Sequence, residues 1–528
     1  MSNHAYESAA ALRPGSNGPI PISTLCERFS LAPASADDAA ALNDLSILGV
    51  SVDSADTAPG ELFVGLPGFT AHGARFAAEA VASGAVAVLT DADGALIAHE
   101  VVPGTPVLVH DDPRAVVGPL SAEVYHHPAR GLVTTAVTGT NGKTTTAYFL
   151  DAILSAHVGG CMVAGTVELR VGERSVESPR TTVEAPVLQR MMALAVEDRV
   201  GAASLEASSH AIVLHRLDGT EIDVAGFTNL QRDHLDFHKT MEGYLEAKAR
   251  LFTPEHARRG VVCVDDRWGA ALADEAPIEI DRVRAYPGDA PADWWVSDAA
   301  VSLTDSATTF TLHGPDGEQI EASCPLPGLV NVQNAALALV MAIRAGVPAA
   351  TATAALAGAH NIPGRMQRIS QRDGRRGLCI VDFAHTPDAM ELALKAVRPI
   401  TPGRLIVVFG SDGDRDQGKR PMLGEVCARL ADVLVVTDEN PRSEDPQFIR
   451  NAILDGVRTV RPDLEDVEEV TTWRGDAVRR GVELCGPDDT VIVTGKGHEP
   501  FLEMAGEFIR YNDAPVMAEA VEEKWGRA

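Results

Sequence analysis

Residues 132 to 156 read LVTTAVTGTNGKTTTAYFLDAILSA, and this stretch decides the fold class. The apolar, β-branched run at its start predicts a buried strand, and the run after the glycine-containing loop predicts a helix. A strand, such a loop and a helix in this order form the phosphate-binding unit of α/β nucleotide-binding domains. There, backbone N–H groups and the helix N-terminus contact phosphate, Lys143 supplies a positive charge, and Thr144 offers its hydroxyl to Mg²⁺. The stretch therefore predicts a P-loop-type α/β domain.

Four apolar runs predict the strands of another sheet in the last third of the chain. The runs are LCIVDF (378–383), RLIVVF (404–409), DVLVVT (432–437) and TVIVTG (490–495). Helical stretches separate them, which is typical of a parallel, doubly wound sheet. Polar residues follow every run, and ligands bind outside the carboxyl ends of the strands in such sheets. We therefore expect a second ligand site at that edge.

The length of 528 residues exceeds what one hydrophobic core supports. We expect three α/β domains. Their expected bounds are 1–130 for an N-terminal domain that begins with a flexible tail, 131–363 for the central domain and 364–528 for a Rossmann-like C-terminal domain. The proline-glycine pair in NIPGR (361–365) is the expected joint before the last of them.

Composition excludes several classes of partner and location. The formal charge of −29 disfavours nucleic acid and anionic lipid as partners, because both require a basic face. No window approaches the roughly 20 apolar residues that cross a bilayer, and the first residues lack the pattern of a secretory signal. Seven cysteines without a CxxC pair argue against disulfides and zinc. We expect a cytoplasmic protein without a membrane span.

Two polar clusters follow further apolar runs in the central part. Glu206 comes directly after VGAASL, and His234 comes shortly after VAGFT. Taken alone, such residues are more often satisfied core or surface groups. Next to a phosphate loop, carboxylate, imidazole and hydroxyl groups at strand ends indicate a site for a hard metal ion and a polar substrate.

Ten ordered motifs between residues 139 and 499 resemble those of the Mur ligases. They are TGTNGKTT, EASSHA, FTNLQRDHLD, YLEAKARLF, PGLVNVQNAA, PGRMQ, VDFAHTPD, GDRDQGKRP, DENPRSEDP and GKGHE. Residues 50–68, VSVDSADTAPGELFVGLPG, are similar to the family's uridine-binding region. The resemblance thus covers nearly the whole chain.

The resemblance implies an amide ligase with three substrates. ATP would phosphorylate the D-glutamate carboxylate of UDP-MurNAc-L-Ala-D-Glu, and the amine of an amino acid would then displace phosphate, which gives an amide, ADP and phosphate. The first domain would hold the UDP moiety, the central domain ATP and two Mg²⁺ ions, and the third domain the amino acid. Since transferred phosphoryl groups concentrate negative charge, a lysine and Mg²⁺ are the expected stabilisers.

Motif by motif, the resemblance assigns site residues. The ATP-binding residues would be Gly139, Thr140, Asn141, Gly142, Lys143, Thr144, Thr145, Asn331, Arg365 and Asp382. The catalytic residues would be Lys143, Lys248, Glu206 and His234. Thr144 and Glu206 would bind one Mg²⁺ and His234 the second, and Lys248 would carry a carbamate (N6-carboxylysine). Residues that hold the UDP-muramoyl dipeptide would be Ser54, Thr181, Thr182, Ser208 and Arg216. From the residues alone, Lys248 is a surface lysine, and the threonines and Asn331 are turn or cap residues.

The incoming amino acid is expected to be meso-diaminopimelate. Asn440-Pro441-Arg442 stands where diaminopimelate-adding members have their arginine motif, and a guanidinium can bind a distal carboxylate with two hydrogen bonds. The whole implied pocket comprises Arg415, Glu439, Asn440, Pro441, Arg442, Gly495 and Glu499. Departures from the family pattern occur at Ala55, Phe383, Ser411-Asp412, Glu439 and Pro500.

Three alternatives stay open. The same reaction could use L-lysine, the chain could be a ligase of the folylpolyglutamate synthetase type, or it could be an ATP-binding scaffold without turnover. The long first domain and the DENPR and GKGHE motifs disfavour the second alternative, and intact Lys143, Glu206, His234 and Lys248 disfavour the third. We expect the chain to act as a monomer.

Overall fold

The computed structural model describes residues 9–68, 70–302, 307–359 and 362–526. The chain divides into two compact units: one comprises residues 1–284, 288–294 and 337–355, and the other comprises 285–287, 295–336 and 356–528. The mixed α/β class is confirmed, while the bounds at residues 130 and 363 stay predictions. Asn361 of the expected joint lies outside the described residues.

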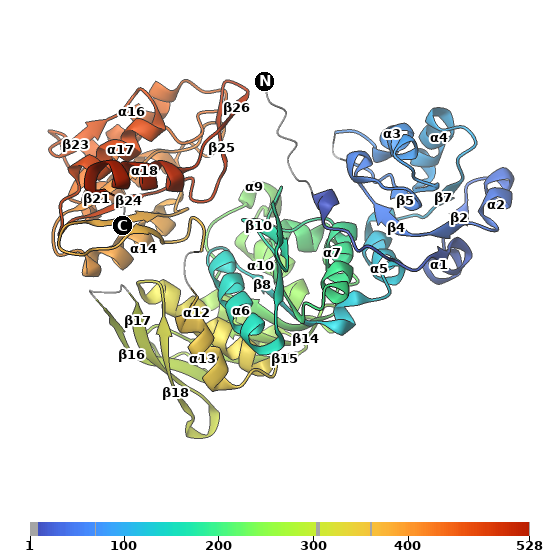
Figure 1. Ribbon diagram of the computed structural model, residues 1–528, viewed down its shortest axis with the longest axis horizontal. Helices are drawn as coiled ribbons and strands as arrows, with labels where there is room; N and C mark the ends of the chain where they lie inside the picture. Colours follow the sequence, from blue (N-terminus) through green and yellow to red (C-terminus); the bar gives the residue numbers. More distant parts are fainter. Residues whose placement is uncertain (1–8, 69, 303–306, 360–361, 527–528) are drawn as a thin grey trace. The chain divides into compact units, whose positions relative to one another are not determined.

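A five-stranded sheet forms the start of the first unit, with strand order β2-β7-β6-β5-β4. Its strands are β2 (Ala32–Pro33), β4 (Gly49–Ser51), β5 (Glu61–Val64), β6 (Ala87–Thr90) and β7 (Val107–Val109). Its helices are α1 (Ile22–Phe29), α2 (Ala36–Leu42), α3 (Ala77–Ala82), α4 (Ala92–Val101) and α5 (Pro113–Val124). Alternate residues of each strand enter two different cores, Leu62 and Val64 with α1 and α5, and Phe63 with α3 and α4. Helices therefore cover both faces of the sheet (Figure 1).

The expected flexible tail has a defined place from Ala9 onward, and residues 1–8 lie outside the described part of the chain. Leu12 is fully buried in the core of the central sheet. Arg13 pairs with Asp56 and Glu61 of the N-terminal sheet region. Burial of an apolar side chain and two ion pairs hold this segment against the unit, which the composition of the tail did not indicate.

The central sheet of the first unit contains the predicted phosphate-binding strand at its middle. Within the first unit, the strand order is β11-β10-β9-β12-β8-β13-β14-β15. The strands are β8 (Val133–Thr138), β9 (Cys161–Ala164), β10 (Glu168–Val171), β11 (Arg174–Glu177), β12 (Ala202–Glu206), β13 (Ile222–Phe227), β14 (Ala257–Cys263) and β15 (Glu279–Arg284). Neighbours from β9 through β15 run parallel, and β10 and β11 are antiparallel.

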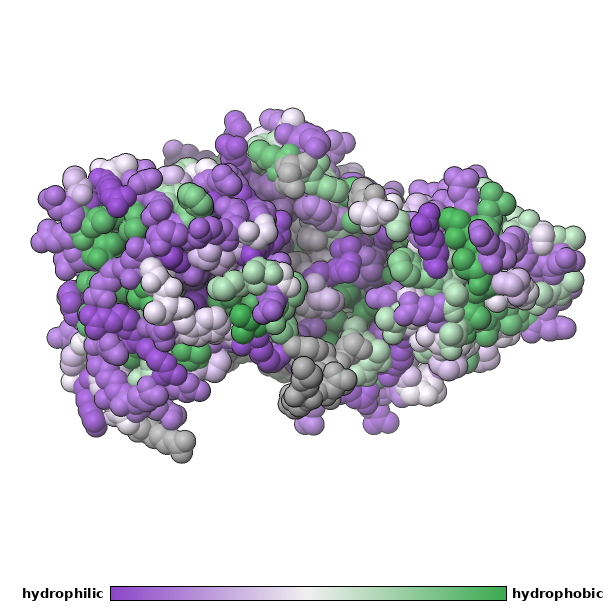
Figure 2. Space-filling view, turned by 90° about the horizontal axis from the view of Figure 1, so that it is seen from above, coloured by the Kyte–Doolittle hydropathy of each residue, from purple (hydrophilic) through white to green (hydrophobic). Residues whose placement is uncertain are grey.

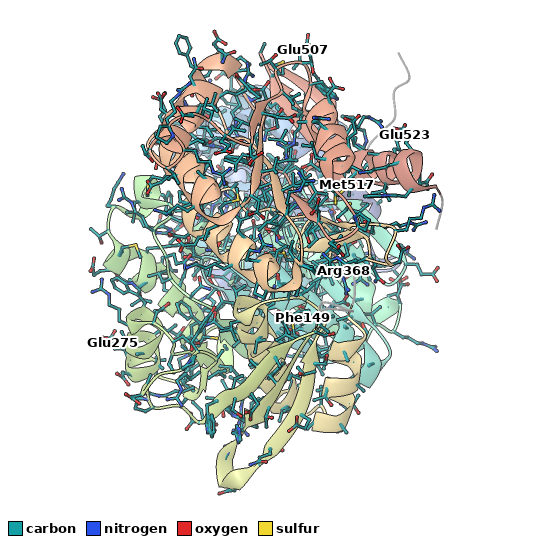
Figure 3. The ribbon with its side chains drawn as sticks, turned by 90° about the vertical axis from the view of Figure 1, so that its left-hand side faces the viewer. Phe149, Glu275, Arg368, Glu507, Met517 and Glu523 are labelled. Atoms are coloured by element: carbon teal, nitrogen blue, oxygen red, sulfur yellow. The ribbon has the colours of Figure 1, made fainter. Side chains whose placement is uncertain are left out.

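Helices follow the strands of the central sheet, and the first of them, α6, is the helix predicted after the phosphate loop. They are α6 (Lys143–Val158), α7 (Ala185–Glu197), α8 (Ser209–Val213), α9 (Leu235–His238), α10 (Met241–Ala249) and α11 (Arg267–Glu275). Two more helices, α12 (Leu329–Arg344) and α13 (Ala349–Ala357), belong to this unit only over residues 337–344 and 349–355. Phe149 on α6, labelled in Figure 3, is fully buried. Its burial fixes α6, and with it the loop that precedes this helix.

The second unit contains the predicted doubly wound sheet. Its strand order is β19-β20-β24-β21-β22-β23, and all neighbours except β19 and β20 are parallel. The strands are β19 (Gln367–Ser370), β20 (Leu378–Val381), β21 (Leu405–Phe409), β22 (Val433–Val436), β23 (Val467–Glu469) and β24 (Thr490–Val493). Each predicted apolar run therefore forms a strand, with the polar cluster at its carboxyl end.

Five helices flank this sheet, and two antiparallel elements complete the unit. The helices are α14 (Pro387–Val397), α15 (Lys419–Leu430), α16 (Pro446–Arg458), α17 (Arg474–Leu484) and α18 (Asp513–Trp525). The antiparallel strands are β16 (Trp294–Val301), β17 (Thr308–His313), β18 (Gln319–Cys324), and the hairpin β25 (Phe501–Met504) and β26 (Glu507–Arg510). Met517, labelled in Figure 3, is fully buried in the core beneath α17 and α18.

The surface agrees with the acidic composition. Hydrophilic residues cover much of the face shown in Figure 2, with smaller apolar areas between them. Within the described ranges, no helix is both long and apolar enough to cross a membrane. All seven cysteines are free thiols, and six of them are buried.

Candidate functional site

The phosphate loop lies between β8 and α6, and two glycines shape it. Gly139 has φ +141° and Gly142 has φ +91°, which L side chains rarely adopt. A Cβ atom at Gly139 would come within 1.9 Å of the Thr228 hydroxyl oxygen. Lys143 opens α6 and folds its Nζ back onto the carbonyl oxygens of Gly139 (3.0 Å) and Thr140 (2.8 Å). The loop thus places a lysine and the N-terminus of a 16-residue helix at one point.

The loop is held by the segment after β13. The Asn229 side chain accepts a hydrogen bond from the Asn141 N–H (3.1 Å), and the Asn141 amide donates to the Gln231 side chain (2.6 Å). The Thr140 hydroxyl accepts from the Gln231 N–H (2.9 Å). Thr145 is buried on α6. The FTNLQ motif therefore fixes the conformation of the phosphate loop.

Glu206 ends β12, the neighbour of β8, and is the centre of a hydrogen-bonded cluster. Its Oε2 accepts from the Thr144 hydroxyl (3.0 Å), and its side chain is almost fully buried. Thr166, which the sequence reasoning missed, donates to Glu206 through both its N–H (2.8 Å) and its hydroxyl (2.9 Å). The only available signal was the position of Thr166 just after the apolar run that forms β9. A hydroxyl and a carboxylate at adjacent strand ends are suitable ligands for Mg²⁺.

The residues expected to hold the dipeptide lie around Glu206. Thr182 donates its hydroxyl to the Glu206 carbonyl (2.7 Å) and accepts from the Ser208 N–H (3.0 Å). The Thr181 and Thr166 hydroxyl groups are hydrogen-bonded to each other (3.1 Å). The structure therefore brings three predicted substrate residues to the same place as the predicted metal ligands. Arg216 also reaches the carbonyl of Thr182 (3.3 Å).

Arg216 and Ser54 occupy different surroundings. Arg216 is paired with Glu184 (2.9 Å), and burial lowers the pKa of its guanidinium. Ser54 follows β4 in the N-terminal sheet, is nearly buried and donates to Glu79 (2.8 Å). Within the described part of the chain, no hydrogen bond joins Ser54 to the cluster around Glu206. The role of Ser54 in binding the UDP-muramoyl dipeptide therefore stays a prediction.

Lys248 is buried, which excludes the surface position that its sequence context alone favoured. Only 1% of the residue is exposed. Its Nζ donates to the carbonyl of Gly139 (2.8 Å) and lies 4.5 Å from the centre of the Tyr244 ring. Burial and the nearby Lys143 charge hold the pKa of Lys248 well below its usual range. Both lysines thus meet at one carbonyl of the phosphate loop.

His234 lies at the start of α9, with φ +53°. Its ring packs edge-on against His210 at 4.9 Å between ring centroids and against Tyr244 at 6.1 Å. Burial lowers the pKa of His234, so the ring is neutral at neutral pH, as a metal ligand must be. Among the described residues, no three His, Cys, Asp or Glu side chains form a ready metal site.

Three of the predicted nucleotide residues lie in the second unit. Asn331 is inside α12, where its amide donates to the Pro327 carbonyl (2.8 Å), so it is not the N-cap of this helix. Arg365 lies over the Phe383 ring at 4.4 Å. Asp382 accepts from the N–H groups of Met366 and Ala384, and burial raises its pKa. Arg365, Asp382 and Phe383 thus form one local group.

A hydrogen-bonded chain joins the loops after β21, β22 and β24. Asn440 donates to Asp412 (3.1 Å) and to Glu499 (3.1 Å). Lys496, fully buried, donates to Asn440 (2.9 Å) and Glu499 (2.9 Å). The predicted pocket residues Asn440 and Glu499 are therefore together. Asp412 and Lys496 were not assigned from the sequence. Lys496 lies in the GKGHE motif, and Asp412 lies at one of the departures from the family pattern.

Glu439 is buried beside Gly495. A Cβ atom at Gly495, which has φ +107°, would lie 2.5 Å from Glu439 Oε2. This oxygen is buried and accepts no hydrogen bond within the described part of the chain. Burial, with the charge of Asp412 as a second cause, raises the pKa of Glu439 to about 8. The pocket therefore carries a protonated carboxyl group at neutral pH.

Arg442 faces two carboxylates. Its guanidinium lies 4.0 Å from Asp412 and 3.6 Å from Glu503. The backbone of Arg442 pairs with the hairpin, since its N–H donates to the Glu503 carbonyl (3.0 Å). Pro441 packs on the loop after β21, where a Cβ atom at Gly413 would come within 1.9 Å of the Pro441 carbonyl oxygen. Arg415 is exposed on the loop after β21.

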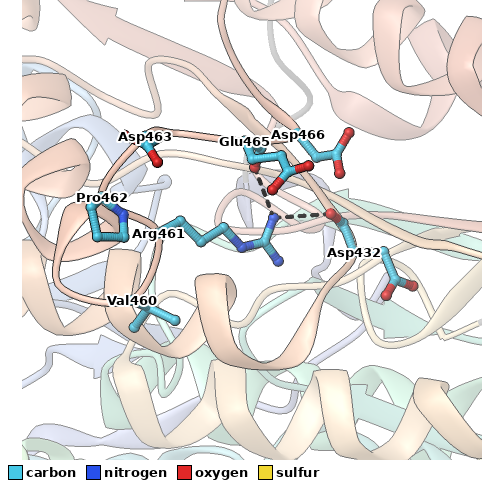
Figure 4. Close-up of a pocket in the computed structure, with 7 residues that line it drawn as sticks. All are labelled: Asp432, Val460, Arg461, Pro462, Asp463, Glu465 and Asp466. Atoms are coloured by element: carbon cyan, nitrogen blue, oxygen red, sulfur yellow. Dashed lines mark hydrogen bonds between the residues drawn. The ribbon is translucent and has the colours of Figure 1, made fainter.

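A surface pocket in the second unit lies at the opposite edge of this sheet (Figure 4). Its lining residues precede β22 and β23 rather than follow them, and they are Asp432, Val460, Arg461, Pro462, Asp463, Glu465 and Asp466. Arg461 fills it and donates to the carbonyls of Asp432 (2.9 Å) and Glu465 (3.3 Å). The polar clusters that end the strands lie elsewhere, so we do not assign this pocket to the site.

Comparison with known proteins identifies the class. Three family descriptions match the chain: "Mur ligase family, catalytic domain" over residues 46–125, "Mur ligase middle domain" over 137–342, and "Mur ligase, glutamate ligase domain" over 364–497. The chain belongs to the Mur ligase family, whose members are ATP-dependent, amide-forming ligases.

Two individual relatives and one solved structure are similar to the chain over most of its length. The chain is 43% identical over 483 residues to a UDP-N-acetylmuramoyl-L-alanyl-D-glutamate--2,6-diaminopimelate ligase of Streptomyces avermitilis, with 92% of this chain and 94% of the relative covered. It is 42% identical over 508 residues to a UDP-N-acetylmuramyl-tripeptide synthetase of Leifsonia xyli subsp. xyli, with 95% and 96% covered. A solved structure of a UDP-N-acetylmuramoyl-L-alanyl-D-glutamate--2,6-diaminopimelate ligase matches with a TM-score of 0.63 and 31% identity, over 90% of this chain and 95% of that one.

Proposed function

We propose that this protein ligates meso-diaminopimelate to the D-glutamate carboxylate of UDP-MurNAc-L-Ala-D-Glu, with ATP as co-substrate. The observation that carries the proposal is the cluster around Glu206. It joins Thr144 of the phosphate loop to Thr181 and Thr182, the residues expected at the dipeptide. A carboxylate to be phosphorylated would thus lie next to the phosphate donor.

The chemistry follows from the poor leaving group of a carboxylate. The carboxylate oxygen attacks the γ-phosphorus of ATP, ADP leaves, and an acyl phosphate forms. The amine of the amino acid then attacks the acyl carbon, and phosphate leaves with the formation of the amide. Lys143, at the N-terminus of α6, would stabilise the negative charge on the transferred phosphoryl group.

The residues around Glu206 fit Mg²⁺. Thr144 and Glu206 would hold one ion, and His234 would hold a second. Mg²⁺ binds through one or two protein groups together with substrate phosphates, which fits a site without three acidic or imidazole ligands. When bound, Mg²⁺ neutralises charge on the phosphates. Thr166 would orient the Glu206 carboxylate for this role.

Lys248 is proposed to be carbamylated. A neutral amine is the form that attacks CO₂, and burial beside Lys143 favours that form. The nitrogen would bond to the carbon of CO₂ and release one proton, which converts the lysine into a carboxylate beside Lys143. The experiment is ¹³C NMR of the protein in ¹³C-bicarbonate. A carbamate signal in the wild type that is lost in Lys248→Ala supports the proposal, and equal spectra contradict it.

Arg442 is the residue that we propose to bind the distal carboxylate of meso-diaminopimelate. A guanidinium can donate two parallel hydrogen bonds to that group. Glu499 with the Gly495 carbonyl would bind an ammonium group, and Arg415 the other carboxylate. The name of the Streptomyces relative supports diaminopimelate, while the name of the Leifsonia relative states no amino acid.

The test is phosphate release with ATP, Mg²⁺ and UDP-MurNAc-L-Ala-D-Glu, in the presence of meso-diaminopimelate, L-lysine or neither. We expect release that depends on the nucleotide dipeptide and on meso-diaminopimelate. Turnover with L-lysine alone would establish the lysine alternative. Turnover only with a folate substrate and glutamate would establish the folylpolyglutamate alternative, and no turnover with any of them would establish the scaffold.

We also propose that the protein acts as a cytoplasmic monomer. Free thiols at all seven cysteines are typical of a reducing compartment. Light scattering of the active protein would test the monomer, and a stable dimer would contradict it.

A further inference from the structure

Arg474 is a fully buried arginine at the start of α17, outside the set of residues assigned to any ligand. Its guanidinium makes two hydrogen bonds to Asp513, from Nε to Oδ1 (2.9 Å) and from Nη2 to Oδ2 (2.8 Å). Both side chains have no exposed surface. Two further bonds leave this pair and reach backbone carbonyls, those of Asp438 (2.9 Å) and Thr494 (2.7 Å).

These two carbonyls belong to the two loops that carry the proposed amino-acid pocket. Asp438 precedes Glu439 and Asn440 after β22, and Thr494 precedes Gly495 after β24. The two strands are not neighbours, because β21 lies between them. Strands two places apart are separated by roughly 9–10 Å, so no ladder hydrogen bond can link these loops. The Arg474 guanidinium instead joins the two loops by hydrogen bonds from one rigid, planar group to a carbonyl of each.

The residues before α18 support the same loop from the other side. The Asn512 amide donates to the carbonyls of His498 (3.0 Å) and Glu499 (3.2 Å). The Tyr511 N–H donates to the Pro500 carbonyl (2.9 Å), and its hydroxyl donates to Asp513 (2.8 Å). The partner of Arg474 is therefore part of a segment that itself holds the loop at residues 494–499.

We propose that Arg474, held by Asp513, is a positioning residue that sets the spacing between the loops at 438–442 and 494–499 and thereby the affinity for the incoming amino acid. The proposal rests on the proposed function for the identity of the ligand. Arg442 and Glu499 lie on different loops, so both ends of one amino acid can be bound only when the loops keep this spacing. A shift of about 1 Å is enough to weaken such a two-point contact.

The experiment compares variants of this pair with a matched variant at the other edge of the same sheet. Removal of one partner from a buried ion pair strongly destabilises a protein, whereas its replacement by apolar residues of similar volume is often neutral. The main variant is therefore the double change Arg474→Met with Asp513→Leu. Arg461→Met is the control, because Arg461 also donates to several backbone carbonyls, but at the amino edge of the sheet.

The double variant is expected to unfold near the wild-type Tm and to show a KM for meso-diaminopimelate raised by about tenfold or more, with the KM for ATP changed by less than about twofold. For Arg474→Lys, we expect a KM for meso-diaminopimelate between those of the wild type and the double variant. An ammonium group keeps the positive charge but cannot reproduce the planar set of guanidinium donors. Arg461→Met should lower Tm and leave the KM for the amino acid unchanged. Equal changes in the KM for both substrates, or an unchanged KM in the double variant, would overturn the proposal.

Hydrogen exchange separates this proposal from the proposed function. Faster amide exchange is expected in the double variant at residues 438–442 and 494–499, and not around the phosphate loop. If the wild type turns over no amino acid, the proposed function fails. The exchange pattern still tests whether Arg474 positions the two loops. Unchanged exchange in both loops would overturn the role of Arg474, whatever the substrate.

Discussion

The phosphate loop and the amino-acid loops both follow parallel strands, yet they are held in opposite ways. The phosphate loop is shaped by its own glycines and by Lys143 on its own carbonyls, and it is held by residues after β13, a direct neighbour of β8. The loops after β22 and β24 are separated by β21, and they depend on buried side chains such as Lys496 and Arg474. The first site combines a local motif with the ends of adjacent strands, and the second depends on contacts between loops whose strands are not neighbours.

This difference has consequences for specificity. A phosphate group is the same in every ATP-dependent relative, so a local motif is sufficient to bind it. Amino acids differ at their far end, and the pocket for them contains Asp412 and Glu503 close to Arg442 and Glu499 close to Lys496. The balance of these charges is a property of this chain. Changes in the first region should therefore affect all turnover, and changes in the second should affect the amino acid.

The largest effect is expected from Lys143→Ala. This variant lacks the positive charge that would stabilise the transferred phosphoryl group, so kcat for phosphate release should fall by about 10²–10³-fold. Lys395→Ala, which removes an exposed lysine paired with Glu391, is the control and should retain activity. A kcat for Lys143→Ala close to that of the wild type would reject the phosphate site.

Thr166→Val should weaken Mg²⁺ binding by roughly 10–100-fold, because the hydroxyl that orients Glu206 is lost. The measurement is the Mg²⁺ concentration that gives half-maximal activity. Thr146→Val is a matched control, since the buried hydroxyl of Thr146 makes no hydrogen bond in the described structure. The idea is wrong if both variants require the same Mg²⁺ concentration as the wild type.

Arg442→Ala should raise the KM for meso-diaminopimelate and leave the KM for ATP nearly unchanged. A lost charged hydrogen bond costs about 1.5–3 kcal/mol, which corresponds to roughly 10–100-fold. Arg429→Ala, which breaks an exposed pair with Glu425, serves as the control. Comparable shifts in both KM values would remove Arg442 from the amino-acid pocket.

The smallest effect concerns stability and pH at Glu439. Its pKa is raised from 4.5 to about 8, so between these values the folded protein keeps a proton that the unfolded chain releases. The free energy of unfolding contributed by this group therefore falls as pH rises through that window. Glu439→Gln cannot titrate, so the wild-type Tm should decline relative to the variant between about pH 5 and pH 8. Parallel Tm curves would show that Glu439 has an ordinary pKa.

Features with a local sequence signal could be predicted, and contacts between distant segments could not. Strands β8, β20, β21, β22 and β24 were expected from their apolar runs, and the loop from Gly139 to Thr144 was expected from its glycines, because both signals are local. Contacts that join distant segments left no local signal. Examples are Thr166 on Glu206, Arg474 across β21 and the anchored Leu12. The burial of Lys248 is of the same kind, since its helix shows no periodic pattern that would place it inside.

In our interpretation, the phosphate site is common to ATP-dependent relatives, and the amino-acid pocket determines which amino acid is ligated. The most direct measurement is mass spectrometry of the nucleotide product formed from ATP, Mg²⁺, UDP-MurNAc-L-Ala-D-Glu and equal amounts of meso-diaminopimelate and L-lysine. We predict that the wild type forms the diaminopimelate product almost alone, and that Arg442→Ala reduces this preference. A predominant lysine product, or the same product ratio in both proteins, would contradict the account.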